Sequence, residues 1–167
     1  GIALAEAGNA KEAIVQHLAA IKINPNDYRN HHNLGLSLAL DGKNEEAIAH
    51  FLTAIKINPN HYDTHIYLGI ALASQGKSEE ALSEFRRAII INPSSTIAHI
   101  NSGVILEMYF NDYDQAIYHY RQALQIDPNN ASIHFNCARA LDKKGEISEA
   151  IKYFSDKLGK KCLKIIA

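Results

Sequence analysis

The sequence predicts an all-α protein in which helix hairpins stack into a solenoid. A phrase repeats along the chain: AIKINPN occurs at residues 20–26 and again at 54–60, and the variants AIIINPS and ALQIDPN surround Pro93 and Pro128. The only prolines stand at positions 25, 59, 93 and 128, so they are 34, 34 and 35 residues apart. A fixed period of this size is typical of repeat proteins, whose units bury their apolar faces by stacking on one another.

Each unit divides into two helical segments. Residues 29–41 carry apolar side chains three and four positions apart, and residues 44–57 resume this helical periodicity. Gly42 lies between the segments, where a left-handed residue would end the first helix. We expect Asn44 and Ser78 to cap the second helices of their repeats. The Asn-Pro pairs end these second helices, because the residue before proline is pushed away from helical angles.

The landmarks set the repeat boundaries. We expect a partial repeat over residues 1–27, complete repeats over 28–61, 62–95, 96–130 and 131–158, and a cap or tail over 159–167. The repeat over 96–130 contains one extra residue between its helices, where the capping glycine is missing and Tyr109, Phe110 and Tyr113 appear. Because the chain starts inside a repeat and without methionine, we expect a fragment of a longer protein.

Small residues recur inside the helices. Gly35, Gly69 and Gly103 occupy one repeat position within the first helices, where glycine costs about 1 kcal/mol relative to alanine. Recurrence at this cost indicates that another helix approaches closely. Phe51 and its equivalents are expected to fill the space between repeats.

These landmarks resemble the tetratricopeptide repeat family, whose pattern is Trp-x2-Leu-Gly-x2-Tyr…Ala-x3-Phe…Pro. The chain reads His31-x2-Leu34-Gly35, then Ala47-x3-Phe51 and Pro59, and the resemblance covers nearly its whole length. Histidine replaces the family's tryptophan, and leucine replaces its tyrosine. The resemblance implies a right-handed α-solenoid whose first helices line a concave groove that binds a protein or peptide.

By the same resemblance, the groove residues come from fixed positions of each first helix. They are Arg29, His32, Asn33, Leu36, Ile66, Tyr67, Ile70, Ile100, Asn101, Val104, Phe135, Asn136 and Arg139. Asn33, Asn101 and Asn136 share one position and resemble the asparagine ladder in the repeat region of O-linked N-acetylglucosamine transferases; the alternative is that they bridge adjacent helices. The apolar members favour a binding strip; the alternative is that they are buried. Tyr109, Phe110 and Tyr113 are a possible secondary partner site or a cover for their own hairpin.

Several other partners and chemistries are disfavoured. The chaperone-binding subclass needs cations for a C-terminal carboxylate, but the corresponding positions hold Ile97 and Asn101 or, one repeat on, Ser132 and Asn136. The net charge of −1 gives no basic excess for nucleic acid. No apolar run is long enough to span a membrane. We therefore expect neither nucleic acid, nor membrane, nor chaperone C-termini as partners.

Cofactor and enzyme signatures are also missing. The repeated histidines at 31, 65, 99 and 134 are expected to lie too far apart for one metal ion, so we expect no metal and no cofactor. No phosphate-binding loop, zinc-protease motif or nucleophile elbow is present. Cys137 and Cys162 form no disulfide framework, which favours an intracellular, cytoplasmic location.

Three functional hypotheses follow. The first is a non-catalytic interaction scaffold that binds a protein segment in the groove. The second is the substrate-recruiting region of a larger enzyme, such as a glycosyltransferase. The third is a self-association module that forms homo-oligomers through exposed repeat ends.

Overall fold

The computed structural model describes residues 2–158 and the side chains of residues 9–153; the cap or tail expected over 159–167 lies outside this range. The described residues form nine α-helices and no strand. The first compact unit, residues 1–91, contains α1 (Ile2–Ile23), α2 (Tyr28–Leu40), α3 (Asn44–Ile57), α4 (Tyr62–Ser74) and α5 (Ser78–Ile91). The second, residues 92–167, contains α6 (Thr96–Tyr109), α7 (Tyr113–Ile126), α8 (Ala131–Lys144) and α9 (Ile147–Leu158). This is the predicted all-α solenoid of helix hairpins.

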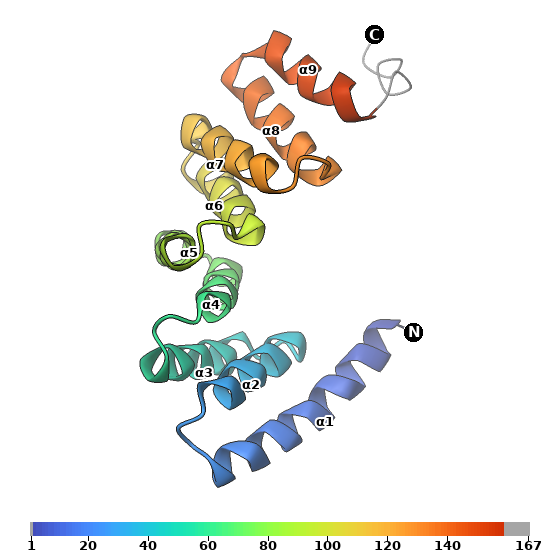
Figure 1. The fold of residues 1–167 in the computed structure, drawn as a ribbon. Helices are drawn as coiled ribbons and strands as arrows, with labels where there is room; N and C mark the ends of the chain where they lie inside the picture. The colour runs from blue at the N-terminus through green and yellow to red at the C-terminus, as the bar shows by residue number, and fades with distance from the viewer. Residues whose placement is uncertain (1, 159–167) are drawn as a thin grey trace. The chain divides into compact units, whose positions relative to one another are not determined.

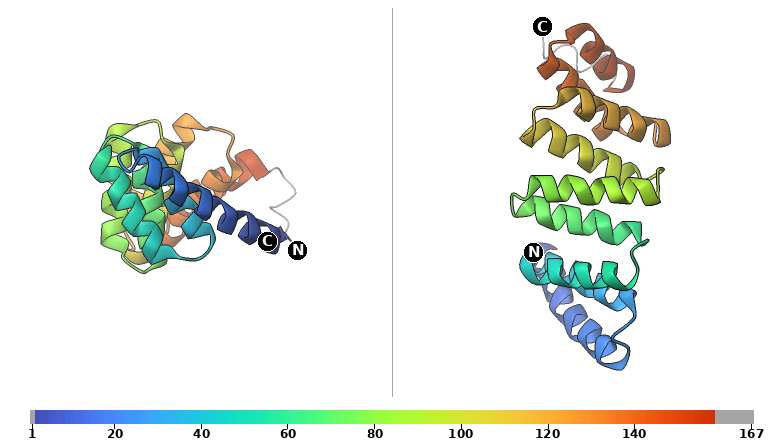
Figure 2. Two further views of the ribbon diagram at one scale, coloured as in Figure 1. Left: turned by 90° about the horizontal axis from the view of Figure 1, so that it is seen from below. Right: turned by 90° about the vertical axis from the view of Figure 1, so that its left-hand side faces the viewer.

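Within each unit the helices pack in chain order. The hairpins are α2–α3 and α4–α5 in the first unit and α6–α7 and α8–α9 in the second (Figure 1). The first helices also meet across a repeat boundary, since α2 contacts α4 and α6 contacts α8. A side view shows how the helices of each unit are layered one after another (Figure 2). Because these contacts join only adjacent helices or adjacent repeats, the side chains of one junction can differ from those of the next without altering its packing.

Glycine closes most of the hairpins. Gly42, Gly76 and Gly145 have φ angles of 81°, 76° and 89°, in the left-handed region where a side chain would be strained. The residue after each glycine bonds back to the end of the preceding helix; for example, the Lys43 N–H donates to the Leu38 carbonyl at 2.9 Å. Lys43 is thereby the N-cap of α3 and Asn44 its first helical residue, while Ser78 likewise lies at the start of α5. The expectation that Asn44 and Ser78 act as caps was therefore wrong by one residue.

The extra residue of the third complete repeat lengthens α6 to 14 residues, against 13 in α2 and α4, instead of lying between the helices as the sequence predicts. Asn111 adopts the left-handed conformation in place of glycine, with φ of 52°. The N–H of Asp112 donates to the Leu106 carbonyl at 3.0 Å, six residues back, whereas the other hairpins span five. Asp112 then caps α7, because its side chain accepts a bond from the Gln115 N–H. The connection to α7 therefore keeps three residues, as in the two preceding hairpins, and α6 is one residue longer than α2 and α4.

The recurrent glycines lie beneath aromatic rings. A Cβ atom added to Gly35 would lie 2.6 Å from Cε1 of Phe51, and the same distance separates such an atom on Gly103 from Tyr120. Gly69 has the same relation to Phe85. This is tighter than packing allows, so the first helix of each of these repeats needs glycine to admit the ring of its own second helix.

A histidine bond joins each complete repeat to the turn before it. Nε2 of His31, His65, His99 and His134 lies 3.1, 2.9, 3.1 and 2.9 Å from the carbonyl oxygen of the proline six residues earlier. The carbonyl can only accept, so each histidine donates. Histidine thus replaces the tryptophan of the family pattern with a side chain that fixes the Asn-Pro turn.

Candidate functional site

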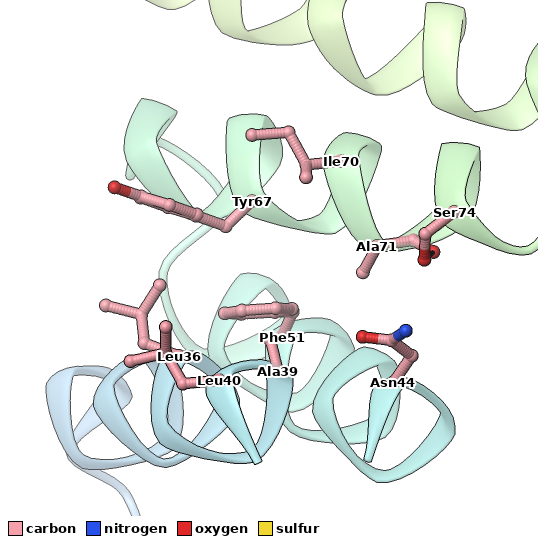
Figure 3. A pocket seen from close by; sticks show the side chains of 9 residues that line it. All are labelled: Leu36, Ala39, Leu40, Asn44, Phe51, Tyr67, Ile70, Ala71 and Ser74. Carbon is pink, nitrogen blue, oxygen red and sulfur yellow. Dashed lines mark hydrogen bonds between the residues drawn. The ribbon is translucent and has the colours of Figure 1, made fainter. Parts of the chain in front are cut away.

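The first unit contains an apolar pocket at the junction of its two complete repeats. It encloses about 410 Å³ and opens between α2 and α4, with α3 at its base (Figure 3). Its lining consists of Leu36, Ala39, Leu40, Asn44, Phe51, Tyr67, Ile70, Ala71 and Ser74. No lining side chain is charged. A pocket of this composition accepts an apolar group and repels a charged one, because a charge would lose its water without gaining a partner.

Small and large residues together produce this space. Ala39 on α2 and Ala71 on α4 leave the centre of the junction unfilled, and the fully buried ring of Phe51 forms its floor. Leu40, Tyr67 and Ile70 stand around it and remain 73%, 39% and 40% exposed. Large apolar side chains that stay exposed around a cavity mark an interaction surface more strongly than apolar residues scattered singly.

Aromatic contacts hold Tyr67 in place at the pocket. Its ring stacks on that of Phe51, with centroids 6.4 Å apart, and meets the edge of His32 at 5.8 Å. His32 is buried, and its Nδ1 lies 3.0 Å from the hydroxyl oxygen of Thr64, which in turn lies 2.7 Å from Nδ1 of His61. Tyr67 is therefore a positioned side chain, with rigid neighbours on α2 and α3.

His32 keeps this part of the site uncharged at neutral pH. Burial is the main reason that its pKa falls to about 4, and the nearby ring of His61 lowers the pKa further, while the carboxylate of Asp63 opposes the shift. The imidazole therefore stays neutral at pH 7. The ring that packs behind Tyr67 is consequently neutral and not a cation.

The groove residues predicted in the first unit fall into three groups: some line the pocket, some are exposed to solvent and some are buried. Leu36, Tyr67 and Ile70 line the pocket. Asn33 is exposed, and Arg29 is exposed and paired with Asp27 at 2.7 Å. Two residues depart from a groove position: Ile66 is 2% exposed and belongs to the core, and His32 is buried with its polar atom directed at Thr64. His32 points inward because its helix face packs against α4 of the next repeat.

The groove residues predicted in the second unit make more hydrogen bonds and ion pairs than those lining the pocket of the first unit. Asn101 donates from its amide to the Ile97 carbonyl of its own helix at 2.9 Å. Arg139 lies 5.7 Å from the centre of the Phe135 ring and binds Glu107, so its charge is already paired. The other predicted side chains, Ile100, Val104 and Asn136, are partly buried.

The aromatic loop of the second unit is exposed in part. Tyr109 and Phe110 are 51% and 39% exposed, and the hydroxyl of Tyr113 donates to the amide oxygen of Asn111 at 3.1 Å. The loop therefore offers apolar surface, whereas Tyr113 holds the turn that replaces the capping glycine. Its role as a secondary partner site stays a prediction.

Sequence reasoning missed several side chains of these junctions. Phe51 was assigned to packing and Ala39 was not singled out, although the absence of bulk at Ala39 opens the pocket. Glu107, at the same repeat position as Ala39, is 1% exposed. The available signal was a paired change: Glu107 replaces Ala39 of the earlier repeat, and Tyr120 replaces Phe51. A hydroxyl and a carboxylate that appear together indicate a hydrogen bond.

Among the described residues, no three histidine, cysteine or acidic side chains converge as a metal site would require. No helix of the described range is long and apolar enough to cross a membrane.

Comparisons with known proteins agree with this architecture. Two family models match the sequence: one described as "Tetratricopeptide repeat" over residues 32–96, and one described as "TPR repeat" over 107–145, together more than half of the chain. No curated protein sequence matches.

Among solved structures, MamA is 24% identical, with a TM-score of 0.85, and the match covers 96% of this chain and 93% of that one. PilF of Pseudomonas aeruginosa is 21% identical, with a TM-score of 0.80 and coverages of 88% and 67%. YrrB, described as a TPR protein with an unusual peptide-binding site, is 19% identical, with a TM-score of 0.74 and coverages of 90% and 77%. At these identities the likeness shows the fold.

Proposed function

The chain belongs to the tetratricopeptide repeat family, and from this premise we propose that it is a non-catalytic scaffold that binds a protein segment through the pocket between α2 and α4. The observation that carries the proposal is the uncharged lining around a space of about 410 Å³, with three predicted groove residues, Leu36, Tyr67 and Ile70, at its wall. The peptide-binding site named for YrrB is consistent with this use of the fold.

The chemistry of the pocket defines the segment that it would bind. One large apolar side chain, such as leucine, isoleucine or phenylalanine, would enter between Tyr67 and Ile70 and contact Phe51. The residues beside it would be uncharged, since Asn44 and Ser74 are the polar side chains of the lining and neither can compensate a charge. Aromatic and aliphatic anchors in such pockets dominate the affinity of many interfaces.

The test is selection of peptides from a random library displayed on phage. We expect enrichment of peptides that share a large apolar residue in an uncharged context. Ile70→Arg should reduce the affinity of a selected synthetic peptide at least about tenfold, because the guanidinium would enter an uncharged site. Ile90→Arg is the matched control, since Ile90 is 71% exposed on α5 and lies outside the pocket. Equal binding by the parent and the Ile70→Arg variant would refute the proposal.

The same selected peptide also tests the asparagine prediction. Asn33 is exposed on α2, and its amide could bond a peptide backbone. Asn33→Ala should weaken binding less than Ile70→Arg if the apolar anchor dominates. The enzyme-recruitment and self-association hypotheses stay predictions; a light-scattering mass equal to that of the monomer at high concentration would count against self-association.

A further inference from the structure

The histidines that bond to the proline carbonyls impose a hydrogen-bonding constraint on their other ring nitrogen. Nε2 of His31 carries the hydrogen that is donated to the Pro25 carbonyl. In the neutral ring, Nδ1 must then be an acceptor. The same holds for His65 and His99. Whatever faces Nδ1 from the second helix of the hairpin therefore decides how the contact responds to a proton.

The facing group alternates along the chain. Nδ1 of His31 meets Nδ1 of His50 at 3.2 Å, and Nδ1 of His99 meets Nδ1 of His119 at 3.1 Å. In the repeat between them, Nδ1 of His65 meets a carboxylate oxygen of Glu84 at 2.6 Å. One hydrogen fits between two facing nitrogens, so each histidine pair is satisfied when a single hydrogen is shared. A carboxylate instead favours a protonated ring.

We propose that the two histidine pairs make the hairpins α2–α3 and α6–α7 loosen in mild acid, while the α4–α5 hairpin is held by its carboxylate. A first extra proton can enter a pair at the outer nitrogen of the partner ring without breaking the shared bond. A second would place hydrogens on both facing nitrogens and two positive charges about 3 Å apart, so the rings must separate. The unfolded chain accepts both protons freely, and mild acid therefore favours opening.

The surroundings of the histidine pairs also oppose protonation of the folded hairpins. Burial, followed by the ring of His31, lowers the pKa of His50, and the carboxylate of Glu46 on the same helix opposes this. Burial also lowers the pKa of His99, against the effect of its bond to Pro93. The ring of Tyr118 packs edge-on against His119. Folded hairpins with lowered histidine pKa values bind fewer protons than the unfolded chain, so their stability falls as the pH drops below about 6.5.

The pKa shift of His65, in the middle repeat, is opposite in direction to the shifts of His50 and His99. Burial alone would lower the pKa of His65, but its bonds to Glu84 and to the Pro59 carbonyl raise the pKa overall. Its contribution to stability is fully present below the unfolded pKa and is lost as the pH rises through the folded pKa. Acid therefore strengthens this contact over the range in which the histidine pairs weaken.

The experiment exchanges the two kinds of pair. His50→Glu with His119→Glu copies the Glu84 contact into both outer hairpins, and Glu84→His makes the reciprocal change. The pH dependence of the urea midpoint between pH 7.5 and 5.0 gives the protons taken up on unfolding. We expect the double variant to take up fewer protons, by at least about one for each pair, and Glu84→His to take up more. His17→Gln, which removes a histidine outside the pairs, is the matched control.

Hydrogen exchange locates the effect. Lowering the pH from 7.5 to 5.5, after correction for intrinsic exchange, should accelerate exchange in α6–α7 more than in α4–α5. The α6–α7 hairpin gives a clearer test than α2–α3, because α2 also contains His32, whose buried neutral imidazole adds its own acid sensitivity. Unchanged proton uptake in both exchange variants, or equal acceleration in the two hairpins, would overturn the proposal. Neither readout requires a bound partner, so the result is independent of the proposed peptide binding.

Discussion

The junction between α2 and α4 and the junction between α6 and α8 occupy equivalent places in two pairs of repeats, yet their side chains differ in kind. The first contains an apolar pocket, and the second contains an ionic cluster. The charged and hydroxyl groups of the cluster occupy four of the positions that differ: Ala39, Phe51, Ile70 and Ser74 in the first junction correspond to Glu107, Tyr120, Arg139 and Lys143 in the second.

The ionic cluster is centred on a buried carboxylate. Glu107 is 1% exposed and accepts bonds from the hydroxyl of Tyr120 at 3.0 Å and from Nε and a terminal nitrogen of Arg139 at 2.7 and 2.9 Å. Lys143 adds a contact at 3.4 Å. Burial tends to raise the pKa of Glu107, but Arg139, Tyr120 and Lys143 together hold it below its usual range. The carboxylate is therefore ionised and fully partnered at neutral pH.

The comparison shows which part of a repeat is framework and which part is free to vary. Both junctions keep a glycine beneath the aromatic ring of the second helix, at Gly35 and Gly103. With the backbone spacing fixed in this way, the space between consecutive first helices can be left apolar and open or closed by charges. In a solenoid the choice at one junction does not disturb the next, because helices contact only their neighbours.

The largest expected effect comes from breaking the ionic cluster. Arg139→Ala removes the bidentate partner of a buried carboxylate and should cost about 3 kcal/mol of unfolding free energy at pH 7, measured by urea denaturation. Arg121→Ala is the control, because the Arg121–Glu149 pair is exposed and should contribute less than about 1 kcal/mol. If both variants lose the same small amount, Glu107 is not the buried centre described here.

Acid should increase the difference in stability between the two junctions. The lowered pKa of His32 means that the folded first unit excludes a proton that the unfolded chain binds below about pH 6.5. Its stabilising contribution is lost as the pH falls from about 6.5 towards 4, by about 2 kcal/mol at pH 5. His32→Gln should remove this part of the pH dependence. Ile100 occupies the equivalent position in the second unit, so Ile100→Val should leave the pH dependence unchanged.

A graft from one junction to the other tests whether the first junction can form the Glu107–Arg139 pair. Ala39→Glu alone places a carboxylate in the apolar pocket, and Ile70→Arg alone places an unpaired cation there. Together they recreate the Glu107–Arg139 pair, so their effects on the unfolding free energy should be non-additive by about 1–2 kcal/mol in a double-mutant cycle. Strictly additive losses would mean that the pair does not form in the first junction, where Phe51 and Ser74 replace Tyr120 and Lys143.

The repeat architecture was predictable because its causes are local and recur. The Asn-Pro turns, the glycine at the hairpin and the apolar periodicity each act within a few residues, and repetition identifies them. The predicted caps, Asn44 and Ser78, lie one residue after the observed ones. The backbone N–H of the residue that follows each hairpin glycine bonds to the preceding helix, and this bond, not a capping side chain, fixes where the second helix begins. Asn111 could not be recognised as the left-handed residue, since asparagine takes that conformation only where the loop requires it.

The candidate site was predictable only in part. Leu36, Tyr67 and Ile70 followed from their repeat position, whereas Ile66 and His32 at a neighbouring position are buried. A position in the repeat states which way a side chain leaves its helix, but burial depends on how the adjacent repeat packs. The pairing of His31 with His50 joins the two helices of one hairpin, whereas the repeat pattern aligns histidines at equal positions in successive repeats. The relevant partner lay 19 residues away within one hairpin.

The smallest effect concerns one core position at which the two units also differ. Leu34 and Leu68 are buried in the first unit, and Ser102 takes the same repeat position in the second, with its hydroxyl buried and no partner among the described residues. Ser102→Ala should therefore stabilise the protein by about 1 kcal/mol, because it removes a polar group that lost its hydration without gaining a bond. Ser102→Leu would show instead whether this core could admit the side chain of the first unit, and overpacking predicts a loss of about 1–3 kcal/mol. Destabilisation by alanine, measured from the urea midpoint, would mean that the hydroxyl has a partner in solution.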